Sequence, residues 1–145
     1  MATYKKLLKD KDGNSIIPVT EDSPTIVGTT TGNYNYAWKF PDGRLICFQK
    51  YSYSSQNMSS AWGSCYSSGS GVMTPVAYAV PFIAVPAVSA TLSPESGSNI
   101  NCWLSTGLES GVSSTTKPAA YQCVRPTSAT GAAGSINIVA YGFWK

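Results

Sequence analysis

The residues that most often carry out catalysis are scarce in this sequence, and histidine is absent altogether. Without histidine the chain lacks the commonest general base, the commonest metal ligand and the usual partner of a serine or cysteine nucleophile. No G-x-S-x-G motif occurs to activate a serine in another way. The sequence therefore predicts no catalytic serine or cysteine.

Acidic residues offer one alternative chemistry, a pair of carboxyl groups for glycoside cleavage. Such an enzyme needs two carboxyls roughly 5 to 9.5 Å apart, on either side of one bond. Beyond the first 22 residues only Asp42, Glu95 and Glu109 are available, and Asp42 belongs to a Pro-Asp-Gly turn. Glu95 and Glu109 are thus the one candidate pair, against the simpler interpretation of two solvated loop charges. The carboxyls are too scattered to suggest a calcium site.

The cysteines are Cys47, Cys65, Cys102 and Cys123, and none of them forms a C-x-x-C pair. Zinc would need all four thiolates from distant segments, so no metal and no cofactor are expected. In a reducing cytosol the four are expected to be buried free thiols that pack as small hydrophobic residues. The sequence leaves open one or two disulfides in an extracellular particle.

Aromatic residues in polar segments are the stronger candidates for a binding function. Exposed rings stack on the apolar face of a sugar, while neighbouring amides and hydroxyls bind its hydroxyl groups. The competing interpretation is that these rings cap the core or form a subunit interface. The predicted ligand-binding residues, at strand ends or in segments rich in Ser and Asn, are Trp62, Tyr66, Tyr53, Trp103, Asn101 and Gln56.

Charge and hydropathy exclude two other classes of partner. The net charge is +3, and residues 54–71 contain the aromatics Trp62 and Tyr66 but no Lys or Arg, so nucleic acid is not expected. No apolar run reaches the ~18 residues needed for membrane insertion. The basic start is followed at once by charged residues rather than by an apolar stretch, so no signal peptide is expected either.

The scaffold that positions these side chains is predicted to be all-β. Tyr34, Tyr36, Trp38 and Phe40 alternate with smaller or polar residues, which is the period of a strand. No window shows a helical stripe. With turn signals every ~8–12 residues, the pattern favours an antiparallel β-sandwich of about seven or eight short strands. Strands are expected near residues 34–40, 45–53, 76–83, 85–92, 100–104, 120–125 and 136–144. Between them we expect a long loop or an irregular hairpin at 54–71, a loop at 105–118 and a turn or mobile loop at 127–135.

The N-terminal part is expected to be a separate lead-in. Asp12-Gly13 lies between the apolar pairs Leu7-Leu8 and Ile16-Ile17, which predicts a short hairpin. Residues 20–33 have the composition of a linker. We therefore divide the chain into a lead-in hairpin and linker over 1–32 and a β-sandwich domain over 33–145.

Several blocks of the sequence, in the same order, resemble bacteriophage tail-fibre receptor-binding tip domains. Residues 33–48, N-Y-N-Y-A-W-K-F-P-D-G-R-L-I-C-F, are similar to the family's G-x-Y-x-K-x-x-D-G-x-L-I-C-W opening. Residues 80–91 resemble its F-P-x-x-F-x-x-x-P-x-V-x-A-T segment, and residues 136–145 its closing V-x-W-I-A-I-G-x-W-K strand. The start, residues 8–20, is similar to tail-associated proteins from phages and prophages of Gram-positive bacteria. Phe48 replaces the usual Trp-Gly and Tyr141 the usual Ile, and loops 54–71 and 105–118 match nothing in the family.

The resemblance implies a homotrimeric β-sandwich at the fibre tip of the virion tail. Such a domain binds host cell-surface carbohydrate or a wall polymer without cleaving it, and its N-terminal segment contacts other tail proteins. It is assembled in the host cytoplasm and released by lysis, which agrees with the missing signal peptide. Two alternatives stay open: a structural tail or baseplate component with no ligand, and a polysaccharide depolymerase that uses Glu95 and Glu109.

Overall fold

The structure is a computed structural model that describes residues 23–69, 73–96, 102–106 and 113–145. Within these ranges the chain forms nine strands and no helix, so the all-β prediction is confirmed. The predicted N-terminal hairpin lies outside the described residues. The strands are β1 (Thr25–Thr29), β2 (Asn35–Lys39), β3 (Arg44–Met58), β4 (Ser60–Trp62), β5 (Cys65–Ser67), β6 (Ala87–Ser96), β7 (Trp103–Thr106), β8 (Tyr121–Arg125) and β9 (Ala129–Phe143).

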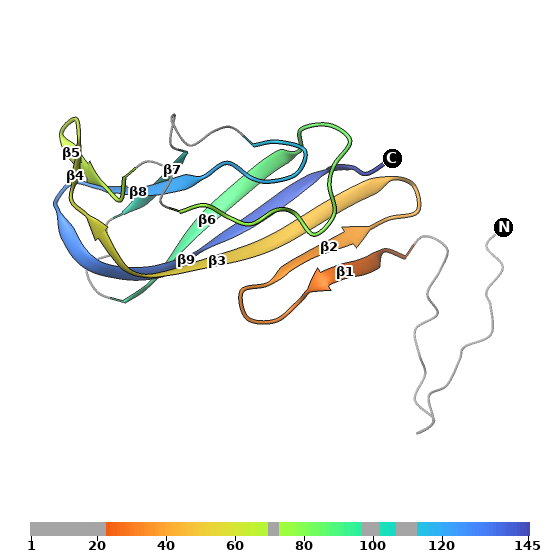
Figure 1. The fold of residues 1–145 in the computed structure, drawn as a ribbon, viewed down its shortest axis with the longest axis horizontal. Helices are drawn as coiled ribbons and strands as arrows, with labels where there is room; N and C mark the ends of the chain where they lie inside the picture. The colour runs from red at the N-terminus through yellow and green to blue at the C-terminus, as the bar shows by residue number, and fades with distance from the viewer. Residues whose placement is uncertain (1–22, 70–72, 97–101, 107–112) are drawn as a thin grey trace, which may run out of the picture.

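Two antiparallel sheets pack in a sandwich-like arrangement (Figure 1). The larger sheet has five strands in the order β1-β2-β3-β9-β6, and the smaller has four in the order β4-β5-β8-β7. The larger sheet is built around β3 and β9, which pair along most of their 15 residues. The hairpin of β4 and β5 lies at the end of the molecule opposite the C-terminus (Figure 1).

The predicted hairpin between residues 34 and 53 is confirmed. Pro41, Asp42 and Gly43 connect β2 to β3, and Gly43 has a φ of +99°, which a side chain would disfavour. The Gly43 N–H donates to the Phe40 carbonyl at 3.1 Å. The Asp42 carboxylate accepts from the Arg44 backbone N–H at 3.0 Å and from its guanidinium at 2.6 Å, so the turn is fixed by its own residues.

A β-bulge bends the long β3–β9 ribbon. The register shifts between Tyr53 and Gln56, and Ser55 between them has a φ of +54°. A bulge increases the local twist and bends the strand that carries it. Figure 1 shows the ribbon curling at this end, and the curl leads β3 into β4 of the smaller sheet.

The core lies between the sheets in two adjoining clusters. Tyr53, Met58, Met73, Cys123 and Ile136 are among the buried residues of the first cluster, between β3, β9 and β8. In the second, an irregular segment takes the place of a sheet. Its buried members are Ala37, Leu45, Cys47, Tyr78, Phe82 and Ala140.

Residues 74–86 form that irregular segment, so the strand predicted at 76–83 is wrong. Its backbone is held by bonds to another loop, the Tyr78 and Phe82 N–H groups donating to the Thr116 and Thr115 carbonyls at 2.9 Å each. The prolines at 75, 81 and 86 lack the N–H that a sheet ladder requires. The rings of Tyr78 and Phe82 pack edge to face at 5.0 Å between centroids, which fills the core that a strand would otherwise supply.

Two segments predicted to be irregular are strands. Residues 25–29, placed in the linker, form β1 and pair with β2 from Thr25↔Lys39 to Thr29↔Asn35. Residues 129–135, placed in a turn or loop, are the first half of β9. Over residues 54–69 the structure shows the irregular hairpin that the sequence allowed, since β3 continues to Met58 and β4 and β5 follow.

Candidate functional site

Two of the predicted ligand-binding residues, Trp62 and Trp103, share one face of the smaller sheet. Ser67, Val124 and Trp103 form one row across β5, β8 and β7. Trp62 on β4 pairs with Cys65, which precedes Ser67 by two residues on β5. Since side chains alternate along a strand, Trp62 and Trp103 point to the same side. Cys123 and Leu104 take the other side and pack into the core, so both tryptophans face away from the core.

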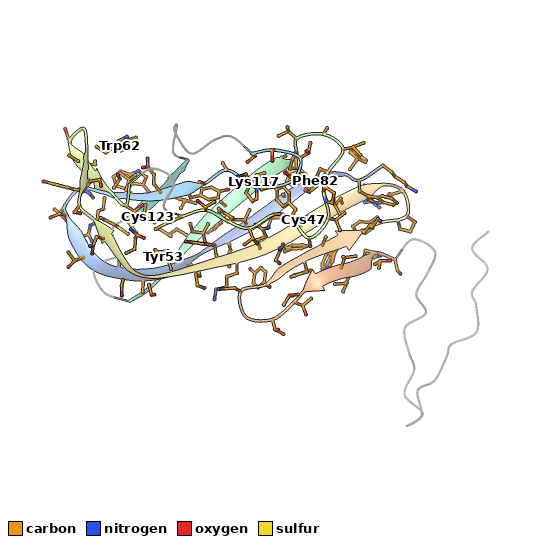
Figure 2. All side chains as sticks on the ribbon, viewed as in Figure 1. Cys47, Tyr53, Trp62, Phe82, Lys117 and Cys123 are labelled. Carbon is orange, nitrogen blue, oxygen red and sulfur yellow. The ribbon has the colours of Figure 1, made fainter. Side chains whose placement is uncertain are left out.

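The two indoles lie on either side of a covered centre. Trp62 is 48% exposed and Trp103 is 45% exposed, whereas Val124 between them is fully buried. The two Cα atoms are three strand spacings apart across the sheet and two residues apart along the strand, which gives a separation of roughly 16 Å. Trp62 lies at the free end of the molecule (Figure 2). This spacing suits an extended ligand better than a single small ring.

The other predicted binding residues do not join this face. Tyr66 is partly exposed but points to the opposite side, in register with Arg125. Tyr53 is only 7% exposed, and its hydroxyl accepts a bond from the Cys123 thiol at 3.8 Å in the core (Figure 2). A stacking role for Tyr53 therefore does not fit its position. Gln56 is half-buried on β3 and donates to the Asn57 carbonyl at 3.2 Å, while Asn101 lies outside the described residues.

A second aromatic surface, on the larger sheet, was not anticipated from the sequence as a site. One row of paired residues crosses all five strands, and the residues next to them along each strand point to the opposite side of the sheet. Its members, in strand order, are Ile26, Trp38, Ile46, Tyr141 and Ala87. Of these, Ile26 is 59% and Tyr141 56% exposed. We call the side of the larger sheet that this row marks the outer face.

Ring contacts fix the side chains of the outer face. Tyr36 stacks on Phe48 with centroids 4.9 Å apart, and Trp38 packs on the same ring at 5.0 Å. Tyr34 meets Tyr36 edge to face at 5.8 Å. The alternating pattern indicated which aromatic residues share one side of a single strand. Only the register between strands shows that these rings meet on one face of the sheet. A contiguous exposed apolar patch of this kind is typical of a surface that contacts another molecule.

All four cysteines are free thiols in the structure. Cys47 and Cys123 are buried, as expected, while Cys65 and Cys102 are half-buried. Burial raises the pKa of Cys123 to about 12 and the pKa of Cys47 to about 11, because the thiolate loses its hydration. Burial also raises the pKa of Cys102. These thiols are packing groups rather than nucleophiles.

We expect the thiols to react at different rates with a disulfide reagent such as DTNB. Only the thiolate attacks, so at pH 8 a pKa of about 11 or 12 slows Cys47 and Cys123 by about a hundredfold or more relative to an ordinary thiol. Their rates should rise with pH until the pH passes these values. Mass spectrometry of labelled peptides measures each site, and the protein in urea serves as the control in which all sites react alike. Labelling of Cys123 as fast as Cys65 in the folded protein would contradict this.

The part of the chain that the structure describes contains no cluster of three or more Cys, Asp or Glu side chains suited to a metal ion. Of the candidate depolymerase pair, Glu95 falls in β6 and Glu109 lies outside the described residues. The described ranges also include no helix able to cross a membrane.

No protein-family model matches this chain, and no curated protein or solved structure matches it either. Its function is therefore inferred from the surfaces of the molecule and from the resemblance of its sequence blocks.

Proposed function

We propose that this protein is a bacteriophage tail-fibre tip domain that binds host cell-surface carbohydrate without cleaving it. The observation that carries the proposal is the pair of exposed tryptophans, Trp62 and Trp103, on the core-distal face of the smaller sheet. The absence of histidine from the sequence supports binding over catalysis. The blocks that resemble tail-fibre tips supply the biological setting, the virion tail of a phage or prophage of a Gram-positive bacterium.

The position of the tryptophans suits a tip. Trp62 and its hairpin lie at one end of the molecule, and the C-terminus lies at the other (Figure 1). All three residues of β4 are exposed, and Ser64 in the turn to β5 is exposed as well. Indole faces with hydroxyl groups nearby are the combination that sugars favour, since rings take the C–H face and hydroxyls take the polar edge.

The partners in this proposal are a host glycan or wall polymer, two further copies of the chain, and other tail proteins that contact the N-terminal segment. The exposed outer face of the larger sheet supports self-association, because burying its aromatic side chains removes apolar surface from water. Three sites on one rigid assembly would also gain avidity from linkage alone.

We expect Trp62→Ala and Trp103→Ala each to weaken binding to the host envelope about tenfold, or ~1.4 kcal/mol. Each change removes an indole face while leaving the core untouched. The measurement is binding of the purified protein to cell-wall polysaccharide fractions from a panel of Gram-positive bacteria. Ile83→Ala is the matched control, because Ile83 is 63% exposed but lies in the irregular segment.

The outcomes separate the alternatives. Unchanged binding by both folded tryptophan variants would contradict the proposed surface. No binding of the assembled protein to any fraction would favour a structural tail or baseplate component, which the apolar outer face also suits. Release of reducing ends from a wall polymer would instead indicate a depolymerase, and Glu95→Gln and Glu109→Gln would then abolish that release.

A further inference from the structure

A cavity of about 230 Å³ lies at the edge of the larger sheet, away from the two tryptophans. Pro75 and Val76, from the irregular segment, form one side of it, and Tyr34 and Tyr51 are among the residues on the other. Its lining is mostly apolar, with a few polar groups among the aromatic rings. Drug-sized ligands occupy roughly 300–1,000 Å³, so this volume suits a single smaller ring.

An open strand edge borders the cavity. The Lys50 N–H donates to the Tyr34 carbonyl at 2.9 Å, just before β2 begins at Asn35. Backbone groups on one side of an antiparallel strand belong to every second residue, so Ser52 has the next N–H and carbonyl on this side of β3. No described strand pairs with β3 at that point on this side. The cavity is therefore bordered by one backbone donor and one backbone acceptor that a ligand can use.

The rim adds polar side chains. The Ser52 hydroxyl donates to the Asn33 Oδ1 at 2.6 Å, and both residues are exposed at the cavity. This bond fixes the Asn33 amide so that its NH2 group can donate outward. Adjacent hydroxyl and amide groups of this kind recognise vicinal hydroxyls.

Gln49 is a buried polar residue of the lining with an unmet hydrogen bond. It is only 2% exposed, and its Nε2 donates to Asn35 Oδ1 at 3.1 Å and to the carbonyls of Val76 at 3.1 Å and Ala77 at 3.0 Å. These bonds hold the irregular segment over the sheet. Its Oε1 accepts no hydrogen bond within the described ranges. This atom is itself buried, so the role of Gln49 at the cavity is to hold Val76 and Ala77 over the sheet rather than to contact a ligand.

We propose that this cavity binds one neutral pyranose ring as a second saccharide subsite, separate from the tryptophan face. The Tyr51 side chain provides apolar contact for the ring, and Ser52 and Asn33 take its hydroxyls. Lys50 is the one ionisable cation among the lining residues, and no carboxylate lines the cavity, so recognition depends on hydroxyl groups rather than on ion pairing. The choice of a sugar rests on the proposed carbohydrate-binding function, whereas the location rests on the geometry alone.

The test is a titration of the full-length, ¹⁵N-labelled protein followed by amide NMR shifts. The probes are N-acetylglucosamine, methyl glucoside, methyl galactoside and methyl mannoside, each up to about 50 mM, since single-ring affinities lie in the millimolar range. We expect saturable shifts at Asn33, Tyr34 and residues 49–52 with at least one probe. Tyr51→Ala and Asn33→Ala should each weaken that binding at least about fivefold. Tyr141→Ala, which removes an exposed ring outside the cavity, should leave it unchanged.

Three results would overturn the proposal: no saturable shift with any probe, shifts that survive both cavity variants, or equal shifts with glycerol, which would indicate an adventitious additive only. Asn33 is exposed, so Asn33→Ala keeps the test valid if Tyr51→Ala does not fold. The double variant Trp62→Ala/Trp103→Ala should keep the cavity shifts while losing envelope binding. Absence of cavity shifts in the original protein, together with intact envelope binding, would reject this subsite and leave the proposed function intact.

Discussion

Replacing Gly134 by alanine should destabilise the protein by about 2–4 kcal/mol, the range of overpacked and strained buried sites. Gly134 lies in β9 opposite Tyr53 on β3 and Pro94 on β6. A Cβ placed there would lie 2.7 Å from the Tyr53 Oη and 2.9 Å from the Ser93 carbonyl oxygen. The backbone oxygen belongs to a paired strand, and the tyrosine is only 7% exposed.

Urea unfolding measures this loss as a lower midpoint at an unchanged slope. Gly131→Asn is the matched control in the same strand. Gly131 has a φ of +66°, a Cβ at this position would meet no atom within 4 Å, and asparagine tolerates this backbone conformation. Gly131→Asn should therefore lower the free energy of unfolding by less than about 1 kcal/mol. An equal effect of the two changes would mean that close packing against Tyr53 is not the reason for glycine at position 134.

The same glycine explains why the sequence misled us about residues 127–135. Two glycines with small neighbours are the composition of a turn, and we predicted a loop on that basis. Gly134 is present instead because the Tyr53 ring passes directly over the β9 backbone. A glycine that makes room for a ring on a neighbouring strand cannot be told from a turn glycine until the pairing partner is known.

Features set by residues close together in the chain could be predicted from the sequence, and features set by distant residues could not. The β2–β3 hairpin depends on neighbours in the chain, and both its strands and its turn were predicted. Strand β1 was missed because a short, largely exposed edge strand carries little hydrophobic pattern of its own and is fixed by pairing with β2. The irregular segment over residues 74–86 was missed because Gln49 and distant loop carbonyls satisfy its backbone.

The candidate sites show the same difference between local and long-range interactions. Trp62 and Trp103 were selected as aromatic residues in polar surroundings, and the structure leaves both exposed on one face. Tyr53 had the same local signal, but it pairs opposite a glycine and its ring turns into the core. The cavity beside Ser52 depends on where β2 begins relative to β3, which no local pattern reveals.

Tyr141→Lys should convert the assembled protein into monomers if the outer face joins copies of the chain. Tyr141 lies in the row that crosses all five strands and is 56% exposed. A lysine at the centre of an apolar contact would be buried without a partner, which is strongly unfavourable. Analytical ultracentrifugation should find about three times the 15.3 kDa chain mass for the original protein and one chain mass for the variant. Thr130→Lys, at an exposed position of β9 away from that row, should remain assembled.

The consequence for binding follows from the placement of the two aromatic surfaces. The outer face belongs to the larger sheet, whereas Trp62 and Trp103 belong to the smaller sheet and point away from the core. Copies joined through their outer faces would therefore leave every tryptophan pair accessible and hold the pairs in one rigid unit. Tyr141→Lys should then weaken attachment to whole cells by about 10²-fold or more, while binding to a short soluble fragment of the same glycan stays unchanged, because only avidity is lost. A monomeric original protein, or a Tyr141→Lys variant that stays assembled, would show that the outer face does not join the copies.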